Sequence, residues 1–290
     1  MTHRIETTPQ RARRVRRAAI QGERGSNSHM AAVELAPDYE VLPCAASADT
    51  FAALLDGRAQ CIVLPIENTL HGSVAEHYDL LLTNPVRIDA EGLLHIRHNL
   101  IAAPGVELSA IRTVLSHPVA LNQCRSFLAS FTQARALPFY DTAGSVKHIT
   151  ENSLSDTAGL APELAAQEYG GNVLMRGVED HAQNFTRFHV IRRLQDAAPS
   201  AAEADKLSVA FALEHRPGTL VHALQALAGA GVNLTRIESR PVPGQPWEYV
   251  FFVEFRFTGA QMAQAALNAL RPETRMVREL GRYKAAASGA

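Results

Sequence analysis

Four short apolar runs in the first half of the chain each lead into a turn rich in hydroxyls, amides and glycine, after which a helix-like stretch begins. The four runs are Ala18–Ile20, Cys61–Leu64, Thr113–Leu115 and Phe139–Tyr140. Apolar runs that alternate with amphipathic stretches are typical of βαβ units in a mainly parallel sheet. The carboxyl ends of such strands share one edge, where ligands bind and helix N-termini offer unpaired N–H groups to anions. The pattern therefore predicts an α/β fold with a pocket for a small, oxygen-rich anion.

The length and charge of the chain narrow the class of protein. Its 290 residues suggest two domains, and its formal net charge of −1 gives no electrostatic case for a nucleic-acid partner. The three cysteines show no metal or redox spacing, and such a sparse set fits the reducing cytoplasm. No apolar run is long enough to cross a membrane and no secretory pattern opens the chain, so we expect a cytoplasmic protein without a membrane partner. The arginine-rich residues 1–15 are expected to form a disordered arm outside the fold.

Two extended segments are expected to divide residues 16–193 into two lobes. Residues 94–102 lack a helical period and are predicted to cross between the lobes, and a second crossing is expected near residues 178–188. Two crossings produce a cleft between a lobe 1 of about 16–95 and 179–193 and a lobe 2 of about 96–178. The helices expected here include Val74–Leu82, Val119–Phe131 and Pro162–Tyr169.

A second unit at residues 206–284 follows a low-complexity linker at residues 194–205. Its periodicity predicts strand, helix, strand, strand, helix and strand, which is the βαββαβ order of a ferredoxin-like domain. The expected elements are Leu207–Leu213, Gly218–Ala228, Asn233–Arg240, Tyr249–Phe257, Ala260–Leu270 and Thr274–Leu280. The segment Pro243–Pro246, with Gly244 inside it, is expected to form the hairpin between the two middle strands.

Seven motifs, in order along nearly the whole chain, are similar to those of a known family. In the first unit they are Gln21-Gly22 through Ser28-His29-Met30-Ala31-Ala32, Pro65-Ile66-Glu67-Asn68-Thr69 with Gly72-Ser73-Val74, Ser116-His117-Pro118 with Gln123-Cys124, Asp141-Thr142-Ala143-Gly144-Ser145-Val146, and Asn184-Phe185-Thr186-Arg187-Phe188. In the second unit they are Pro217-Gly218-Thr219-Leu220 and Glu238-Ser239-Arg240-Pro241. The first unit resembles prephenate dehydratase, and the second resembles the ACT regulatory domain usually fused to it. The resemblance implies a two-lobed, periplasmic-binding-protein-like domain followed by a ferredoxin-like ACT domain.

The resemblance also implies an activity, the decarboxylative dehydration of prephenate to phenylpyruvate in L-phenylalanine biosynthesis, without a metal or an organic cofactor. The sequence agrees, because it shows no ligand cluster of His, Cys and Asp, no phosphate-binding loop and no dinucleotide glycine fingerprint. L-phenylalanine is the implied effector of the ACT unit. The implied assembly is a homodimer or homotetramer formed through the ACT units.

Thr186 and Arg187 are the catalytic residues that the resemblance implies. A threonine hydroxyl is a very weak acid, but it can donate a hydrogen bond to the leaving oxygen and relay a proton in concert. Neighbours in a strand point to opposite faces, so the two side chains share a pocket only if the backbone turns between them. Otherwise Arg187 acts from behind the strand, in a salt bridge.

Two further sets of residues are expected to bind small molecules. A hydrogen bond to a carboxylate contributes about 1.5–3 kcal/mol, so three or four donors can bind a dianion without a lysine. The expected substrate-binding residues are Asn68, Thr69, Ser73, Ser116, Thr142, Gly144, Ser145 and Phe188. The expected phenylalanine-binding residues are Gly218, Thr219, Leu220, Asn233, Glu238, Ser239 and Arg240.

Two other functions fit the same motifs. The first keeps the chemistry and changes the substrate to arogenate, which carries an ammonium group where prephenate has a keto group. The second is a ligand sensor whose two-lobed cleft binds a small anion without turnover. The Thr186-Arg187-Phe188 motif argues against a pure sensor, because binding alone has no need of it.

Overall fold

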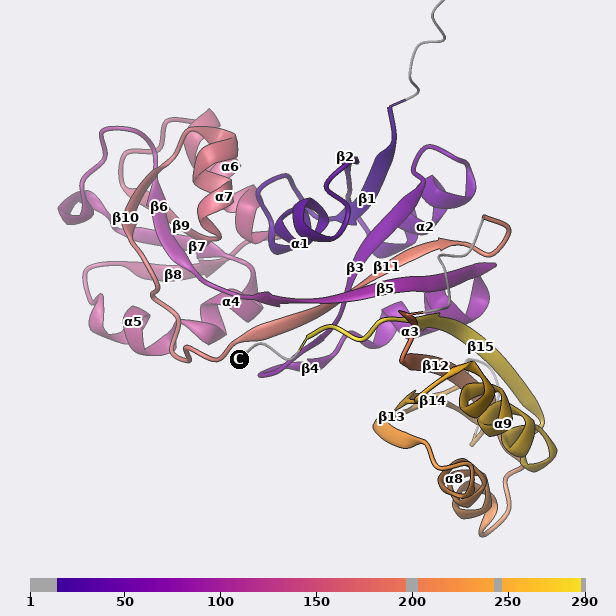
Figure 1. Ribbon diagram of the computed structural model, residues 1–290. Coiled ribbons are helices and arrows are strands. Elements are labelled where there is room, and N and C mark those ends of the chain that lie inside the picture. Colours follow the sequence, from indigo (N-terminus) through magenta and orange to yellow (C-terminus); the bar gives the residue numbers. More distant parts are fainter. Residues whose placement is uncertain (1–14, 197–202, 243–246, 288–290) are drawn as a thin grey trace, which may run out of the picture.

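The computed structural model describes residues 15–196, 203–242 and 247–287 (Figure 1). Apart from Val15, the expected N-terminal arm lies outside the described residues, as do residues 197–202 of the expected linker and the expected hairpin Pro243–Pro246. None of the helices in the described residues is long and apolar enough to cross a membrane.

The first sheet is mixed and lies in lobe 1, with the strand order β2-β1-β3-β11-β5 and β4 paired to β3. Strand β1 runs parallel to β2 and β3, whereas β11 runs antiparallel to β3 and β5. Residues Ala18, Ala19 and Ile20 of β1 are fully buried, as a strand covered on both faces requires. The elements are β1 (Arg17–Gln21), α1 (Asn27–Leu35), β2 (Glu40–Cys44), α2 (Ser47–Leu55), β3 (Cys61–Asn68), β4 (Gly72–Ser73), α3 (Ala75–Thr83), β5 (Val86–His95) and β11 (Phe185–Arg193).

The second sheet forms lobe 2, with the strand order β10-β6-β9-β7-β8. The chain crosses from lobe 1 between β5 and β6, and it returns between β10 and β11 (Figure 1). These are the two crossings that the sequence predicts. The elements are β6 (Asn99–Ala102), η1 (Leu108–Ala110), β7 (Thr113–Ser116), α4 (Pro118–Gln123), α5 (Arg125–Ser130), β8 (Arg135–Pro138), α6 (Thr142–Glu151), β9 (Thr157–Ala161), α7 (Glu163–Tyr169) and β10 (Asn172–Met175).

Three local predictions are wrong. The strand expected at the fourth apolar run, Phe139–Tyr140, lies earlier, at Arg135–Pro138 (β8). Strand β3 continues past Leu64 to Asn68, because β11 pairs with it on both sides of a bulge at Ile66. The expected helix Val119–Phe131 is two short helices, α4 and α5, because the Asp180 carboxylate accepts hydrogen bonds from the backbone N–H groups of Arg125 and Ser126 and starts a new helix there.

The second domain is a ferredoxin-like βαββαβ unit, as predicted. Its antiparallel sheet has the strand order β13-β14-β12-β15, and α8 and α9 cover one face (Figure 1). Successive side chains of β12 and β14 point to opposite faces of the sheet, and apolar residues occur on both faces. One set packs under the ACT helices, and the other packs against the first domain. The elements are β12 (Lys206–Ala212), α8 (Thr219–Gly229), β13 (Asn233–Pro241), β14 (Tyr249–Arg256), α9 (Ala260–Leu270), η3 (Arg271–Glu273) and β15 (Met276–Tyr283).

The other face of this sheet packs against the first domain. Buried side chains from both domains, among them Tyr78 and Leu81 with Phe252 and Leu280, form one hydrophobic cluster. The rings of Tyr78 and Phe252 meet edge to face with centroids 5.0 Å apart. Strand β15 approaches β5 so closely that a Cβ on Gly281 would lie 2.2 Å from the carbonyl oxygen of Ile88. The two domains therefore share a core instead of being joined only by a linker.

Candidate active site

Two adjoining hollows, of about 460 and 530 Å³, lie between the lobes of the first domain. They share five lining residues, which are Asn27, Pro65, His117, Thr142 and Thr186. The first hollow also takes in the turn after β1 and the turn after β8, and the second takes in β4 and the start of α3. Together the hollows form one cleft, and Thr186 lies where they meet.

The turn after β1 is built to face the cleft. Gly25 has a φ of +81°, and a Cβ at this position would lie 2.6 Å from the Cα of Ala165 in lobe 2. Glycine therefore lets lobe 1 touch helix α7 across the cleft. Ser26 caps α1 by accepting a hydrogen bond from the backbone N–H of His29. The first N–H groups of α1, at Asn27 and Ser28, have no intrahelical acceptor and lie beside the cleft.

The Thr186 hydroxyl is held by one amide. Asn68 Nδ2 lies 3.0 Å from Thr186 Oγ1 and 2.8 Å from Asn184 Oδ1. Asn68 Oδ1 in turn accepts hydrogen bonds from the backbone N–H groups of Leu70 and His71. An amide nitrogen only donates, so the Thr186 oxygen accepts from Asn68 and its own hydrogen is left to donate into the cleft.

Arg187 does not line the cleft. Its neighbour Thr186 faces the cavity, and strand alternation turns Arg187 to the opposite face. There its guanidinium forms ion pairs with Glu67 at 3.0 Å, Glu91 at 3.1 Å and Glu254 at 2.7 Å. Burial alone would lower the pKa of Arg187, but Glu254 and Glu91 outweigh it and raise this pKa further. The predicted catalytic cation is therefore a buried cross-link behind the strand.

Of the predicted substrate-binding residues, half line the cleft. Asn68, Ser73, Thr142 and Phe188 do so. The hydroxyls of Ser116 and Ser145 are fully buried and donate to backbone carbonyl oxygens of Leu160 and Thr142, both at 2.6 Å. Thr69 donates to the carbonyl oxygen of Gln183 and accepts from the N–H of Phe185, and the N–H of Gly144 is capped by Asp141. These four residues, Thr69, Ser116, Gly144 and Ser145, support the walls and do not line either hollow.

Several residues that the sequence did not single out do line the cleft. Asn27 Oδ1 is buried there and has no hydrogen-bond partner in the described residues. His117 Nδ1 accepts from the N–H of Val119, so in the neutral ring Nε2 carries the proton. Tyr140 donates to Glu23, and burial together with this carboxylate raises the pKa of Tyr140 to about 12. Asn27, Glu23 and His117 lie in the turns that the strand pattern predicts, so their positions were an available signal, whereas Tyr140 was expected in the apolar run before its turn.

The titratable side chains that line the cleft include three carboxyl groups but no lysine or arginine of the described residues. The carboxyl groups are those of Glu23, Glu76 and Asp141. Burial, with a further contribution from Glu23, raises the pKa of Asp141. Among the residues that the structure describes, no three His, Cys, Asp or Glu side chains are grouped as a metal site.

The predicted effector residues of the second domain lie in three separate places. Thr219 and Leu220 line a hollow of about 90 Å³ with Trp247 and Tyr249, beside Gly218. Asn233 lies at the far end of β13, whose other end pairs with Tyr249. Glu238 and Arg240 face the first domain instead, where they contact Ser73 at 2.8 Å and Asp79 at 2.8 Å. Ser239 lies between them and is exposed.

Comparisons with known proteins agree with this architecture. Residues 18–196 match the family model of prephenate dehydratase, and residues 208–271 match that of the ACT domain. Arogenate dehydratase/prephenate dehydratase 2 of Arabidopsis thaliana, a chloroplastic protein, is 39% identical over 277 residues, which cover 92% of this chain and 72% of that protein.

Two solved structures are also similar over nearly the whole chain. Prephenate dehydratase of Arthrobacter aurescens in complex with L-Phe has a TM-score of 0.83 and 32% identity, with 92% of this chain and 89% of that chain covered. GqqA, described as a novel type of quorum quenching acylase, has a TM-score of 0.85 and 32% identity, with 93% and 98% covered.

The family predicted from the seven motifs is confirmed by these matches, and so are the two kinds of domain and the dehydratase class of enzyme. The chain belongs to the prephenate dehydratase family and carries a C-terminal ACT domain.

Proposed function

We propose that this chain converts prephenate to phenylpyruvate, with Thr186 as its catalytic residue. The observation that carries the proposal is the Thr186 hydroxyl, which accepts from Asn68 and has its hydrogen free at the junction of the two hollows. The family match supports the same reaction. The product places the enzyme in L-phenylalanine biosynthesis.

The reaction needs no external oxidant or reductant. The bond between the ring and its carboxylate breaks and releases CO₂, and the electron pair moves into the ring. The C–O bond on the opposite carbon breaks at the same time, and the departing hydroxyl takes up one proton as it leaves as water. That proton comes ultimately from solvent, which reprotonates any donor side chain. The product ring is aromatic, so the driving force lies in the substrate. The protein has to orient the substrate and stabilise the departing oxygen.

The cleft offers separate groups for these tasks. Thr186 donates a hydrogen bond to the departing hydroxyl, and His117 supplies a second N–H from the opposite lobe. The free N–H groups at the start of α1 and the side chain of Thr142 are placed to hold carboxylates. The Asn68 amide is already committed to Thr186 and Asn184 and holds the catalytic hydroxyl instead. Arg187 acts from behind the strand, as a residue that positions its neighbour.

A turnover assay tests the proposal directly. Purified protein is mixed with prephenate, and phenylpyruvate is followed by its absorbance in alkali. We expect turnover by the wild-type chain and its loss in Thr186→Val, which keeps the side-chain shape and removes the hydroxyl. Binding of prephenate without phenylpyruvate formation would instead favour the small-anion sensor.

Arogenate is a second candidate substrate, and the acidic cleft favours it. Prephenate brings two negative charges into a cleft whose acidic lining residues are Glu23, Glu76 and Asp141. Arogenate brings an ammonium group that offsets one of these charges. Glu23 and Asp141 lie together in the first hollow, and Glu23 is already paired with Lys147 at 3.1 Å, so an ammonium there gains mainly from Asp141 and in part from Glu23.

Parallel assays with both substrates separate the two candidates. If the ammonium binds beside Glu23, Glu23→Gln should raise KM for arogenate several-fold and leave KM for prephenate unchanged or lower. Glu76→Gln, on the other side of Thr186, is the matched control. Equal effects of Glu23→Gln on the two substrates would remove this argument for arogenate.

We also propose that L-phenylalanine regulates the enzyme and that the ACT domains pair in a homodimer or homotetramer. The small hollow at Thr219 and Leu220 supports an effector site, and β13 is an edge strand of the ACT sheet. Val221 and Ile237 are about half exposed near this edge, at 55% and 46%. A second copy would cover them and bring its own Asn233 to a neighbouring hollow. Analytical ultracentrifugation with and without L-phenylalanine tests the assembly. We propose a cytoplasmic location for the protein.

A further inference from the structure

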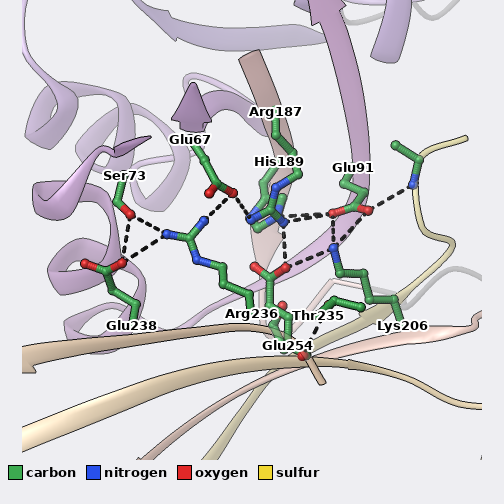
Figure 2. Close-up of polar contacts among 12 residues, drawn as sticks. Glu67, Ser73, Glu91, Arg187, His189, Lys206, Thr235, Arg236, Glu238 and Glu254 are labelled. Atoms are coloured by element: carbon green, nitrogen blue, oxygen red, sulfur yellow. Dashed lines mark hydrogen bonds and ion pairs between the residues drawn. The ribbon is translucent and has the colours of Figure 1, made fainter. Parts of the chain in front are cut away.

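Behind strands β3 and β11, which carry Asn68 and Thr186, charged side chains of both domains form one continuous network (Figure 2). The catalytic domain contributes carboxylates and one guanidinium, and the ACT domain contributes both signs of charge. The members are Glu67, Glu91 and Arg187 of the catalytic domain, and Lys206, Arg236, Glu238 and Glu254 of the ACT domain.

The first link runs through Glu254 on β14. Its carboxylate is 4% exposed, and it lies 2.7 Å from Arg187 Nη1 and 2.9 Å from Lys206 Nζ. Burial would raise the pKa of Glu254, but Arg187 and Lys206 lower it, so the carboxylate stays charged. Arg187 immediately follows Thr186 on β11, so Glu254 holds the backbone next to the catalytic hydroxyl.

The second link runs through Arg236 on β13. Its Nη1 lies 2.5 Å from Glu67 Oε2, which also accepts from Arg187. Glu67 precedes Asn68, the residue that donates to the Thr186 hydroxyl. Arg236 also contacts Ser73, which lines the second hollow. This link therefore connects the ACT domain to β3, the strand that carries Asn68, and to the wall of the cleft at Ser73.

A third ion pair between the domains ends on helix α3, away from the residues that hold Thr186. Arg240 on β13 pairs with Asp79 at 2.8 Å, in the middle of helix α3. Asp79 lines neither hollow and is adjacent in sequence to none of the residues that hold Thr186. The Arg240–Asp79 pair is a contact of the same chemistry that serves docking alone.

We propose that Arg236 and Glu254 of the ACT domain are positioning residues for the reaction in the catalytic domain. Through Glu67 and Arg187 they fix strands β3 and β11, and so they fix the Asn68 amide and the Thr186 hydroxyl. The seating of the ACT domain thereby sets the geometry of catalysis. This inference rests on the proposed dehydratase function, which gives Thr186 its task.

The kinetic test compares three single variants in the full-length protein. Arg236→Gln and Glu254→Gln should each lower kcat by about 10- to 100-fold with KM changed less than about twofold, because a small misplacement of a reacting group costs that much. Asp79→Asn, the matched control, should keep the wild-type kcat. Arg236→Lys, which retains the charge, should recover part of the loss. Wild-type kcat in both network variants, or an equal loss in Asp79→Asn, would overturn the proposal.

Amide hydrogen exchange gives a readout that does not depend on activity. Exchange at residues 66–69 and 185–188 should be faster in Arg236→Gln and Glu254→Gln than in the wild type, and unchanged in Asp79→Asn. If the wild type turned over neither prephenate nor arogenate, the proposed function would fail while exchange still tested the link. If Glu254→Gln did not fold, Arg236→Gln alone would decide, and unchanged exchange in it would refute the inference.

Discussion

At the scale of single residues, Thr186 and Arg187 show how one strand serves two environments. Thr186 faces a cleft lined by polar groups, whereas Arg187 enters a buried set of carboxylates on the other side of the sheet. Buried ion pairs are poorly screened, so removing one partner leaves a charge that has no counterpart. Each side chain is therefore intolerant of substitution for a different reason.

The Thr186 hydroxyl should be replaceable only by another hydroxyl. Thr186→Ala is expected to lower kcat by about 10²- to 10⁴-fold, the usual contribution of a positioned proton donor. Thr186→Ser keeps the donor and should retain most of kcat. Steady-state kinetics on prephenate and arogenate measure both, with far-ultraviolet circular dichroism to show that the fold is intact. Near-wild-type turnover in Thr186→Ala would exclude the assigned role.

His189 should make the folded protein sensitive to mild acid. It is 1% exposed, and burial lowers its pKa from the ordinary value of 6.5. Below pH 6.5 the unfolded chain therefore binds a proton that the folded chain does not, so stability falls as the pH falls, by at most about 1.4 kcal/mol per pH unit for this group. Urea unfolding of His189→Gln between pH 7 and 5 should show a shallower loss than the wild type. Equal slopes for the two proteins would contradict this role of His189.

At the scale of the elements, sequence periodicity predicted the helices and strands whose bounds depend on neighbouring residues alone. The ACT strands and helices follow the sequence periodicity closely, and α9 matches its expected bounds, Ala260–Leu270. The break between α4 and α5 depends on Asp180, more than fifty residues away, and the extension of β3 depends on pairing with β11. The site divides in the same way. Thr142 could be predicted to line the cleft from its position in a turn, whereas Asn27, in another predicted turn, was missed. The contact of Ser73 with the ACT domain required the assembled fold.

The crossing of β15 over β5 should tolerate glycine alone. A Cβ on Gly281 would meet the Ile88 carbonyl at 2.2 Å and its backbone nitrogen at 2.9 Å, so Gly281→Ala forces the two strands apart. We expect a loss of stability of about 1–3 kcal/mol, the usual cost of overpacking. Gly229→Ala in α8, where a Cβ meets no atom within 4 Å, should instead stabilise the protein by about 0.5–1 kcal/mol. Urea denaturation of both variants measures the difference, and equal stabilities would contradict the close approach.

At the scale of the whole molecule, both faces of the ACT sheet are covered except along its edge strand β13, where alternate residues are exposed. One face carries its own helices, and the other completes the core of lobe 1 (Figure 1). Large apolar side chains contribute about 1.5–3 kcal/mol each when they are fully buried. The shared cluster contains several of them on each side of the interface, such as Leu81 and Ile88 with Phe252 and Tyr283. The domains therefore depend on each other for stability, although their folds are distinct.

Removal of the ACT domain should consequently disable the catalytic domain. A chain that ends at residue 205 exposes Tyr78, Leu81 and Ile88 and leaves Glu91 without Lys206. We expect low soluble yield, a lower melting temperature and a kcat reduced at least as much as in Glu254→Gln. A protease site inserted between residues 194 and 205 distinguishes the covalent linker from the domain interface. The cleaved protein lacks the linker but retains both domains in contact, so it should keep its activity. A soluble truncated chain with the wild-type kcat would show that the catalytic strands hold their geometry without the ACT domain, and the positional role of that domain would then be wrong.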